Sequence, residues 1–218
     1  MKIGILGTGT VGETIGTKLV ELGHTVTMGS RDAANVKAAA WVKKAGKHAA
    51  AGTFKDAATA GEIVFNCTSG QGSVAAVTSA GEAALRGKVL IDVSNPLDFT
   101  KGPIPILSVG NTDSLGEQLQ KAVPSAKVVK TLNTLGAPLM VNPRSLADSH
   151  NLFICGDDDG AKAKAVELLR SFGWRDEDIV DLGDITAARG VEAYVLLWVR
   201  IYRRFGSANF NLKLVRGK

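Results

Sequence analysis

The sequence has little of several residue types that mark particular classes of protein. Its 218 residues include two cysteines and three histidines, too few for a disulfide-stapled fold, and neither cysteine has a metal-ligand neighbour. The longest apolar block, Val195 to Val199, stops at Arg200, so nothing approaches the roughly 20 apolar residues of a membrane span. Basic residues exceed acidic ones by 26 to 21 but are dispersed, which does not indicate nucleic-acid binding. We expect no metal, membrane or nucleic-acid partner.

The two cysteines also bear on the cellular compartment. Cys67 and Cys155 each lie within an apolar, strand-like run, which predicts two buried thiols in preference to a disulfide. Free thiols are typical of a reducing compartment. The amino terminus turns glycine-rich within one strand length, too early for a secretory signal. The expected location is the cytoplasm.

What is present indicates an ordinary folded protein. Hydrophobic residues make up 45% and charged residues 22% of the chain, with 25 glycines, which are values of a globular protein with a core. The length suits one domain or one and a half. A cofactor-binding domain together with a full-sized second catalytic domain would not fit.

Strand and helix patterns alternate along the first part of the chain. The apolar spacing predicts strands over 2–6, 24–28, 63–67 and 89–93, and helices over 11–22, 33–45 and 73–85. Strands separated by helices form a parallel sheet covered on both faces. The sequence therefore predicts a doubly wound α/β fold.

The pattern loosens beyond residue 96 and then resumes. It predicts a helix over 115–122 and a strand over 127–132, whereas residues 136–151 contain two prolines and little periodicity. We place a boundary there, giving a large domain over 1–145 and a small C-terminal α/β extension over 146–218. The extension is expected to contain strands over 152–155 and 179–182, a helix over 160–172, and a long final helix over 185–205.

The motif with the clearest chemistry is Gly7-Thr8-Gly9-Thr10-Val11-Gly12, between the first strand and the first helix. In such a G-x-G-x-x-G motif, Gly7 permits a tight turn, Gly9 lets backbone approach a pyrophosphate, and Gly12 lets the helix pack closely on the sheet. The helix amino terminus then faces the phosphates. The motif predicts a Rossmann-type dinucleotide site.

The end of the second strand indicates which dinucleotide is bound. A carboxylate there would accept a hydrogen bond from the ribose 2′-hydroxyl of NAD. This chain instead has Ser30 and Arg31, which suit the 2′-phosphate of NADP. Asp32 follows and would disfavour a phosphate unless it caps the next helix near Ala33. Lys37 is either a further phosphate ligand or a solvated helix lysine.

Polar turns follow three predicted strands, and parallel strands bring their carboxyl ends to one edge of a sheet. Thr68 and Ser69 lie in the first turn, Asn95 in the second and Asn133 in the third. We expect these turns to surround the nicotinamide. Thr68 and Ser69 would contact its ribose or, equally, cap the next helix.

No side chain is placed to act as a general acid or base, so no catalytic residue is assigned. The histidines lie outside the three turns, and Asp157-Asp158-Asp159 reads as helix capping in preference to a cation site. Hydride transfer between two bound cofactors depends more on their alignment and on the exclusion of water than on proton transfer. A site with few acid-base side chains is therefore compatible with hydride transfer. The final helix has aromatic residues every four positions, at Tyr194, Trp198 and Tyr202. They either form a wall for a flat ring system or belong to packed core or a dimer interface.

Five segments carry a family resemblance: Lys2 to Gly9, Gly29 to Arg31, Lys130 to Thr134, Cys155 to Asp158, and Asp181 to Asp184 with Ala188-Arg189. Together they resemble the NADP oxidoreductases that depend on the deazaflavin coenzyme F-420. The long final helix resembles a bacterial branch of that family. The likeness runs nearly end to end.

The resemblance implies a Rossmann domain that binds NADP, a small second domain with dimer and acceptor-site contacts, and a homodimer with the deazaflavin in a cleft. Carried over by position, the contact residues are Thr8, Gly9, Thr10 and Val11 for the pyrophosphate, Ser30 and Arg31 for the 2′-phosphate, and Asn133 and Leu135 for the deazaflavin. Archaeal members that use this coenzyme resemble one another in having His where Asn133 stands.

The sequence leaves three functions open. The first is an NADP(H) oxidoreductase that exchanges hydride with coenzyme F-420 or a flavin-like acceptor. The second is a non-catalytic NADP-binding sensor or interaction protein. The third is an enzyme like the β-hydroxyacid dehydrogenases and pyrroline-carboxylate reductases, which need a helical domain that this length barely allows.

Overall fold

The computed structural model describes residues 1–217. Its first half contains β1 (Lys2–Leu6), α1 (Thr10–Glu21), β2 (Thr25–Ser30), α2 (Val36–Ala45), β3 (Ala49–Thr53), α3 (Phe54–Ala60), β4 (Ile63–Asn66), α4 (Gly70–Ala80), α5 (Glu82–Leu85) and β5 (Val89–Asp92). Its second half contains β6 (Leu97–Asp98), β7 (Ile106–Leu107), α6 (Leu115–Ala122), β8 (Lys127–Thr131), α7 (Ala137–Val141), β9 (Leu152–Cys155), α8 (Asp159–Ser171), β10 (Ile179–Asp181) and α9 (Ala188–Phe205).

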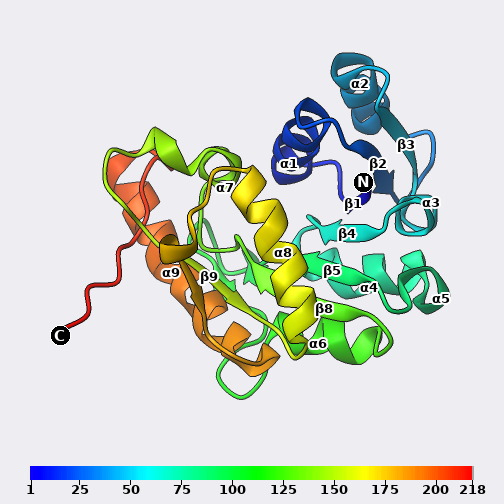
Figure 1. Cartoon of the computed structure of the whole chain (residues 1–218). Helices are drawn as coiled ribbons and strands as arrows, with labels where there is room; N and C mark the ends of the chain where they lie inside the picture. Colours follow the sequence, from blue (N-terminus) through cyan, green and yellow to red (C-terminus); the bar gives the residue numbers. More distant parts are fainter. Residues whose placement is uncertain (218) are drawn as a thin grey trace.

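Within the described residues, eight strands form one sheet in the order β10-β9-β8-β5-β4-β1-β2-β3. Neighbouring strands run parallel, except that β9 is antiparallel to β8. Figure 1 shows the helices around this sheet, with α9 along one flank beside β9. The predicted doubly wound Rossmann-type fold with a long C-terminal helix is confirmed.

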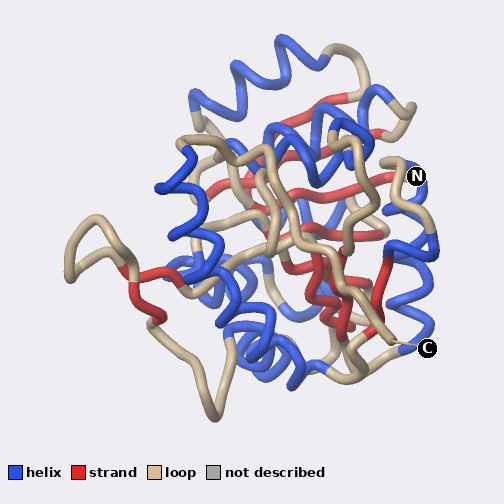
Figure 2. The backbone as a smooth tube through the Cα atoms, turned by 90° about the vertical axis from the view of Figure 1, so that its left-hand side faces the viewer, coloured by secondary structure: helices blue, strands red, loops and turns tan. Residues whose placement is uncertain are grey.

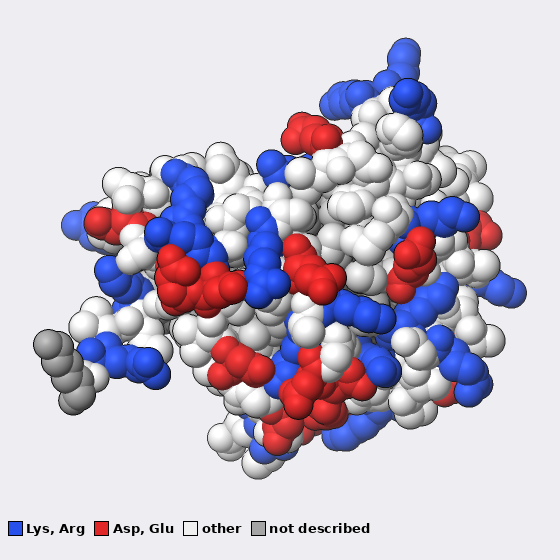
Figure 3. All heavy atoms as spheres, in the orientation of Figure 1, with Lys and Arg blue, Asp and Glu red and all other residues white. Residues whose placement is uncertain are grey.

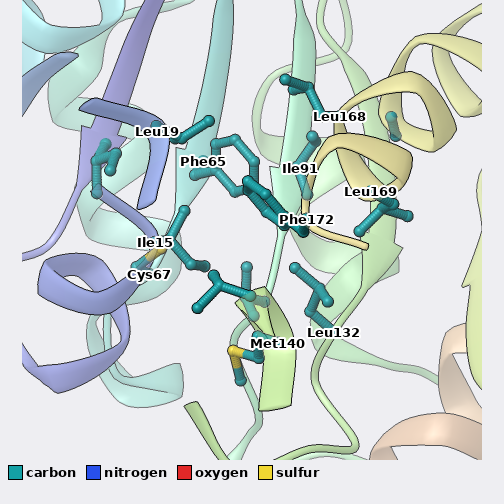
Figure 4. Close-up of a cluster of buried hydrophobic side chains, with 14 of the residues drawn as sticks. Ile15, Leu19, Phe65, Cys67, Ile91, Leu132, Met140, Leu168, Leu169 and Phe172 are labelled. Carbon is teal, nitrogen blue, oxygen red and sulfur yellow. The ribbon is translucent and has the colours of Figure 1, made fainter. Parts of the chain in front are cut away.

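Side chains alternate between the two faces of the sheet and build a core on each. On one face, Ile5, Phe65 and Ile91 pack against α1, α2, α7 and α8, where Ile15, Leu168 and Phe172 are buried (Figure 4). On the other face, the neighbouring residues of the same strands pack against α3, α4, α5 and α6. This alternation is what places helices on both sides of a parallel sheet.

Several elements depart from the sequence expectations. Strand β3 and helix α3 were not predicted, because the alanine-rich segment Ala49–Ala60 has no clear apolar period. The helix expected over 73–85 is two helices, α4 and α5, because Gly81 between them has a φ of 90°. Helix α2 begins at Val36 and not near Ala33, because the Asn35 side chain accepts hydrogen bonds from its first turn.

The C-terminal part, predicted as a small second domain over 146–218, contributes β9 and β10 to the edge of the same sheet. Its helix α8 packs into the hydrophobic core that also holds α1. Figure 2 shows the short β6–β7 hairpin projecting on the side where α9 runs. In residues 1–217, no helix combines the length and the apolar character that a bilayer crossing needs.

Candidate dinucleotide site

The glycine-rich loop joins β1 to α1, and its three glycines have different surroundings. Gly7 has a φ of 118°, and a Cβ there would lie 2.7 Å from the Cys67 carbonyl oxygen. A Cβ at Gly12 would lie 2.3 Å from the Gly7 carbonyl oxygen. A Cβ at Gly9 would meet no atom within 4 Å. The first and third glycines are thus required by the fold, whereas the backbone at Gly9 borders open space.

Helix α1 starts at this open space. Gly9 is its N-cap and supplies no side-chain acceptor, so the N–H groups of Thr10, Val11 and Gly12 have no side chain to bind. Free N–H groups and the helix dipole favour an anion at this end. Ser69, the N-cap of α4, likewise makes no capping hydrogen bond with its side chain. The capping role considered for Ser69 is therefore not realised.

A cavity of about 680 Å³ extends from the glycine-rich loop to the end of β2. It brings together seven of the residues predicted from the sequence, namely Gly7, Thr8, Gly9, Ser30, Arg31, Thr68 and Ser69. Lys37 lies on the exposed surface of α2 and does not line this cavity. The geometry therefore favours the solvated-lysine interpretation of Lys37.

The chain makes a tight turn at the end of β2. Ser30 is buried, and its hydroxyl donates to the Asp32 carbonyl oxygen at 2.5 Å. The Asp32 carboxylate accepts from the Ala34 N–H at 2.9 Å. Asn35, and not Asp32, caps α2, and Asp32 lines the same cavity as Arg31. Arg31 is exposed, lines the cavity and forms no ion pair within residues 1–217. Its guanidinium is free to bind an anion.

A second cavity, of about 540 Å³, shares Cys67, Thr68 and Ser69 with the first. Its other lining residues are Val11, Gly70, Gln71, Val93, Ser94, Asn95, Leu97, Phe99 and Thr100. The two cavities therefore adjoin each other at Cys67, Thr68 and Ser69, and together we call them the cofactor trough. Cys67 is the one titratable residue among these described lining residues, and burial raises the pKa of its thiol. This end of the trough is poor in acid-base groups.

The turns after β5 and β8 meet beside the trough. The Asn95 Nδ2 donates to the Asn133 carbonyl oxygen at 2.7 Å, and the Asn133 Nδ2 donates to the Asn95 Oδ1 at 2.9 Å. Leu132, just before this turn, has a φ of 63°, a left-handed conformation that is costly for a leucine and typical of constrained sites. Asn133 is 3% exposed and also donates to the Val191 carbonyl oxygen. It lies behind Asn95, outside the residues that line either cavity.

Sequence reasoning missed a buried charged cluster beneath these turns. Lys130 of β8 is fully buried, and its Nζ lies 2.5 Å from an Asp92 oxygen, 2.7 Å from a Glu192 oxygen and 2.9 Å from the Ser94 carbonyl oxygen. Burial by itself would lower the pKa of Lys130, but the charges of Asp92 and Glu192 outweigh it and raise that pKa. The sequence feature that could have predicted this cluster is a lysine within an apolar strand of a parallel sheet, because a buried charge requires charged or polar partners.

The remaining candidates have structural roles. Asp158 caps α8, Asp157 accepts from the Ile185 N–H, and no group of metal-binding side chains occurs among residues 1–217. Both cysteines are free and buried, as predicted. Trp198 stacks on Tyr202 and on Phe210. This stacking favours a packing role for Tyr194, Trp198 and Tyr202 over a wall for a bound ring. Figure 3 shows basic and acidic side chains interspersed over the visible face.

Comparison with known proteins agrees with this geometry. Residues 2–96 match the family described as NADP oxidoreductase, coenzyme F420-dependent. A crystal structure from Arthrobacter sp. FB24, described as a candidate F420-dependent NADP reductase, is 47% identical, with a TM-score of 0.93 over 99% of this chain and 100% of that one.

More distant relatives are longer proteins. The chain is 32% identical to metalloreductase STEAP3 of Rattus norvegicus over 197 residues, and 27% identical to metalloreductase STEAP2 of Homo sapiens over 205 residues. These matches cover 89% and 92% of this chain, but the chain spans only 36% and 37% of those relatives. The Arthrobacter structure is similar over the whole of both chains, and on that similarity the present chain belongs to the family of coenzyme F420-dependent NADP oxidoreductases.

Proposed function

We propose that this protein transfers hydride between NADPH and a deazaflavin (coenzyme F-420) or flavin-like acceptor, as a cytoplasmic homodimer. The observation that carries the proposal is the pair of adjoining cavities that make up the cofactor trough. One end has the Arg31 guanidinium, which forms no ion pair within the described residues, beside the Ser30 hydroxyl and the Asp32 carboxylate, which accepts from the Ala34 N–H. The middle has two helix N-termini without side-chain caps, and the other end has Cys67 as the one titratable residue among its described lining residues.

The trough suggests how NADP would lie. The pyrophosphate would rest on the N–H groups at the start of α1, beside Thr8 and Gly9. The 2′-phosphate would bind Arg31, since Arg binds phosphate through paired hydrogen bonds. Ser30 would join it by turning its hydroxyl away from the Asp32 carbonyl oxygen. The nicotinamide would then enter the second cavity, near Thr68, Ser69 and Asn95. This direction follows from the positions of the phosphate-binding groups along the cofactor trough.

The second cavity suits hydride transfer. When bound, the nicotinamide supplies the hydride chemistry itself, so the protein must align the two rings and exclude water. Hydride moves with its electron pair and needs no proton donor at the transferring carbon. Val11, Leu97 and Phe99 give this cavity apolar walls, and its polar groups are hydroxyls and amides that can orient a carboxamide or ribose.

The acceptor is the least constrained part of the proposal. The family description names coenzyme F-420, whereas the relatives named metalloreductases favour a metal-ion acceptor. In this chain Asn133 is buried with its amide donated to Asn95 and Val191, so it would act on the acceptor through the turn it holds.

The test has two steps. Fluorescence titration with NADPH and NADH measures binding, with NADPH expected to bind more tightly. Anaerobic NADPH oxidation is then followed with coenzyme F-420, FMN, FAD and ferric chelates as separate acceptors. Turnover with a deazaflavin or flavin supports the proposal. Tight NADPH binding without turnover on any acceptor would favour the sensor function, and the absence of NADPH binding would refute the proposal altogether.

A further inference from the structure

The buried Lys130 cluster is connected to both turns that face the nicotinamide end of the trough. Asp92 Oδ1 accepts from the Ser94 N–H at 3.1 Å and from the Ser94 hydroxyl at 2.6 Å. Lys130 donates to the Ser94 carbonyl oxygen. Ser94 is therefore held at its N–H, its hydroxyl and its carbonyl oxygen by two charged side chains that lie outside the trough.

The same cluster reaches the turn after β4. Asn66 donates to Asp92 Oδ1 at 2.8 Å, and its own Oδ1 accepts from the Thr68 hydroxyl at 2.7 Å. The two turns also touch directly, because a Cβ at Gly70 would lie 2.0 Å from the Asn95 carbonyl oxygen. A displacement of Asp92 would thus move Thr68 and Ser94 together.

Glu192 ties this network to the C-terminal helix. Its carboxylate lies at the start of α6, where it accepts from the Leu115 N–H at 2.8 Å and the Gly116 N–H at 3.0 Å. The negative charge therefore sits on a helix N-terminus as well as on Lys130. Each of the three protons on the Lys130 ammonium has an acceptor, in Asp92, Glu192 and Ser94. Such a fully satisfied buried network fixes one geometry.

We propose that Lys130, with Asp92 and Glu192, is a positioning unit that sets the nicotinamide-facing turns at the distance and orientation needed for hydride transfer. The inference rests on the proposed function, because it takes the second cavity as the nicotinamide site. A buried ion pair adds little net stability compared with well-packed apolar residues. Its directional hydrogen bonds, by contrast, determine where Ser94 and Thr68 lie.

The two ends of the trough can be tested separately. The probe 2′,5′-ADP contains the phosphorylated adenosine but no nicotinamide, whereas NADPH contains both. In Lys130→Met we expect the Kd for 2′,5′-ADP to stay within about twofold of wild type, because the cluster is not connected to Arg31. The added affinity of NADPH over 2′,5′-ADP and the fluorescence change of the bound nicotinamide should fall, and kcat should drop by about tenfold to a hundredfold, as misplacement of reacting groups predicts.

Lys162→Met is the matched control. The Lys162 Nζ also contacts two carboxylates and a carbonyl oxygen, at 2.8 Å from Asp181, 3.1 Å from Asp159 and 3.3 Å from Gly183, but none of these residues lines the cofactor trough. This variant should lose stability without any change in the ratio of NADPH to 2′,5′-ADP affinity.

Glu192→Gln is a milder second variant, to be used if Lys130→Met does not fold. It keeps one acceptor oxygen for Lys130 and should show the same selective loss of the nicotinamide contribution to binding. Lys130→Arg, which keeps a positive charge in the cluster, should lose less of that contribution than Lys130→Met. If a folded Lys130→Met or Glu192→Gln protein has the wild-type affinity ratio, fluorescence change and kcat, the positioning role is overturned. A wild-type protein that binds 2′,5′-ADP but gains nothing from the nicotinamide would instead overturn the proposed function.

Discussion

Asn95 and Asn133 bind each other through two hydrogen bonds, each donating its side-chain amide to the other residue, at 2.7 Å and 2.9 Å. One residue follows β5 and the other follows β8, so the pair fastens two neighbouring strand ends at the edge of the sheet. Asn133 also donates to the Val191 carbonyl oxygen on α9. The pair therefore joins the trough, the sheet and the C-terminal helix.

This pairing predicts a coupled loss of stability. Asn133→Ala leaves the Asn95 Oδ1 without its donor and removes the side-chain hydrogen bond to the Val191 carbonyl oxygen, which keeps its place in the helical ladder of α9. This should cost about 1–3 kcal/mol in the free energy of unfolding. Urea unfolding of Asn95→Ala, Asn133→Ala and the double variant gives the interaction energy, expected between about 0.5 and 3 kcal/mol. Strict additivity of the two single losses would show that the two amides do not support each other.

The free guanidinium at the end of β2 predicts the cofactor preference. Arg31→Ala should weaken NADPH binding by on the order of 1–3 kcal/mol and leave NADH binding almost unchanged, because a charge-assisted contact to the 2′-phosphate is lost. Fluorescence titration with both nucleotides measures the difference. Lys43→Ala, an exposed lysine in the last turn of α2, is the control. An equal loss for both nucleotides would mean that Arg31 does not recognise the phosphate.

The glycine-rich loop predicts opposite outcomes for two similar substitutions. Gly12→Ala forces a Cβ to 2.3 Å from the Gly7 carbonyl oxygen, so it should lower the melting temperature clearly. Gly9→Ala meets no protein atom and has an extended φ of −87°, so it should fold like wild type but bind NADPH at least about tenfold more weakly. Calorimetry and titration distinguish the two. Undiminished binding by Gly9→Ala would place the pyrophosphate elsewhere.

The Glu117–Arg189 pair predicts part of the acid sensitivity. Hydrogen bonds from Arg189 hold the pKa of Glu117 below its usual 4.5, and the two side chains approach to 2.6 Å. A lowered carboxyl pKa contributes stability that is present above 4.5 and is lost as the pH falls through the folded-state value. Unfolding free energies measured from about pH 5 to pH 3 should therefore fall less steeply in Glu117→Gln than in wild type. Glu82→Gln, on exposed surface, serves as control, and identical slopes for all three proteins would contradict the assignment.

Local patterns in the sequence determined much of the fold. Apolar periods placed most strands and helices, and the glycine spacing placed the turn between β1 and α1, because these features depend on neighbouring residues. Ser30 at the end of β2 and Arg31 directly after it indicated a phosphate-binding end, and both residues line the cavity. Strand β3 and helix α3 escaped prediction because alanine fits either a helix or a strand edge.

Only the tertiary structure decided which distant polar groups meet. Lys130 reads as one lysine in an apolar strand, and its partners Asp92 and Glu192 are far away in the sequence. The same holds for the Asn95–Asn133 pair and for the addition of β9 and β10 to the same sheet. Contacts of this kind depend on how strands are ordered and how helices cross the sheet, and no local period or motif specifies those arrangements. The amino-acid sequence thus determined the glycine-rich turn and the polar strand ends, and the packing of the chain determined which buried groups hold those strand ends together.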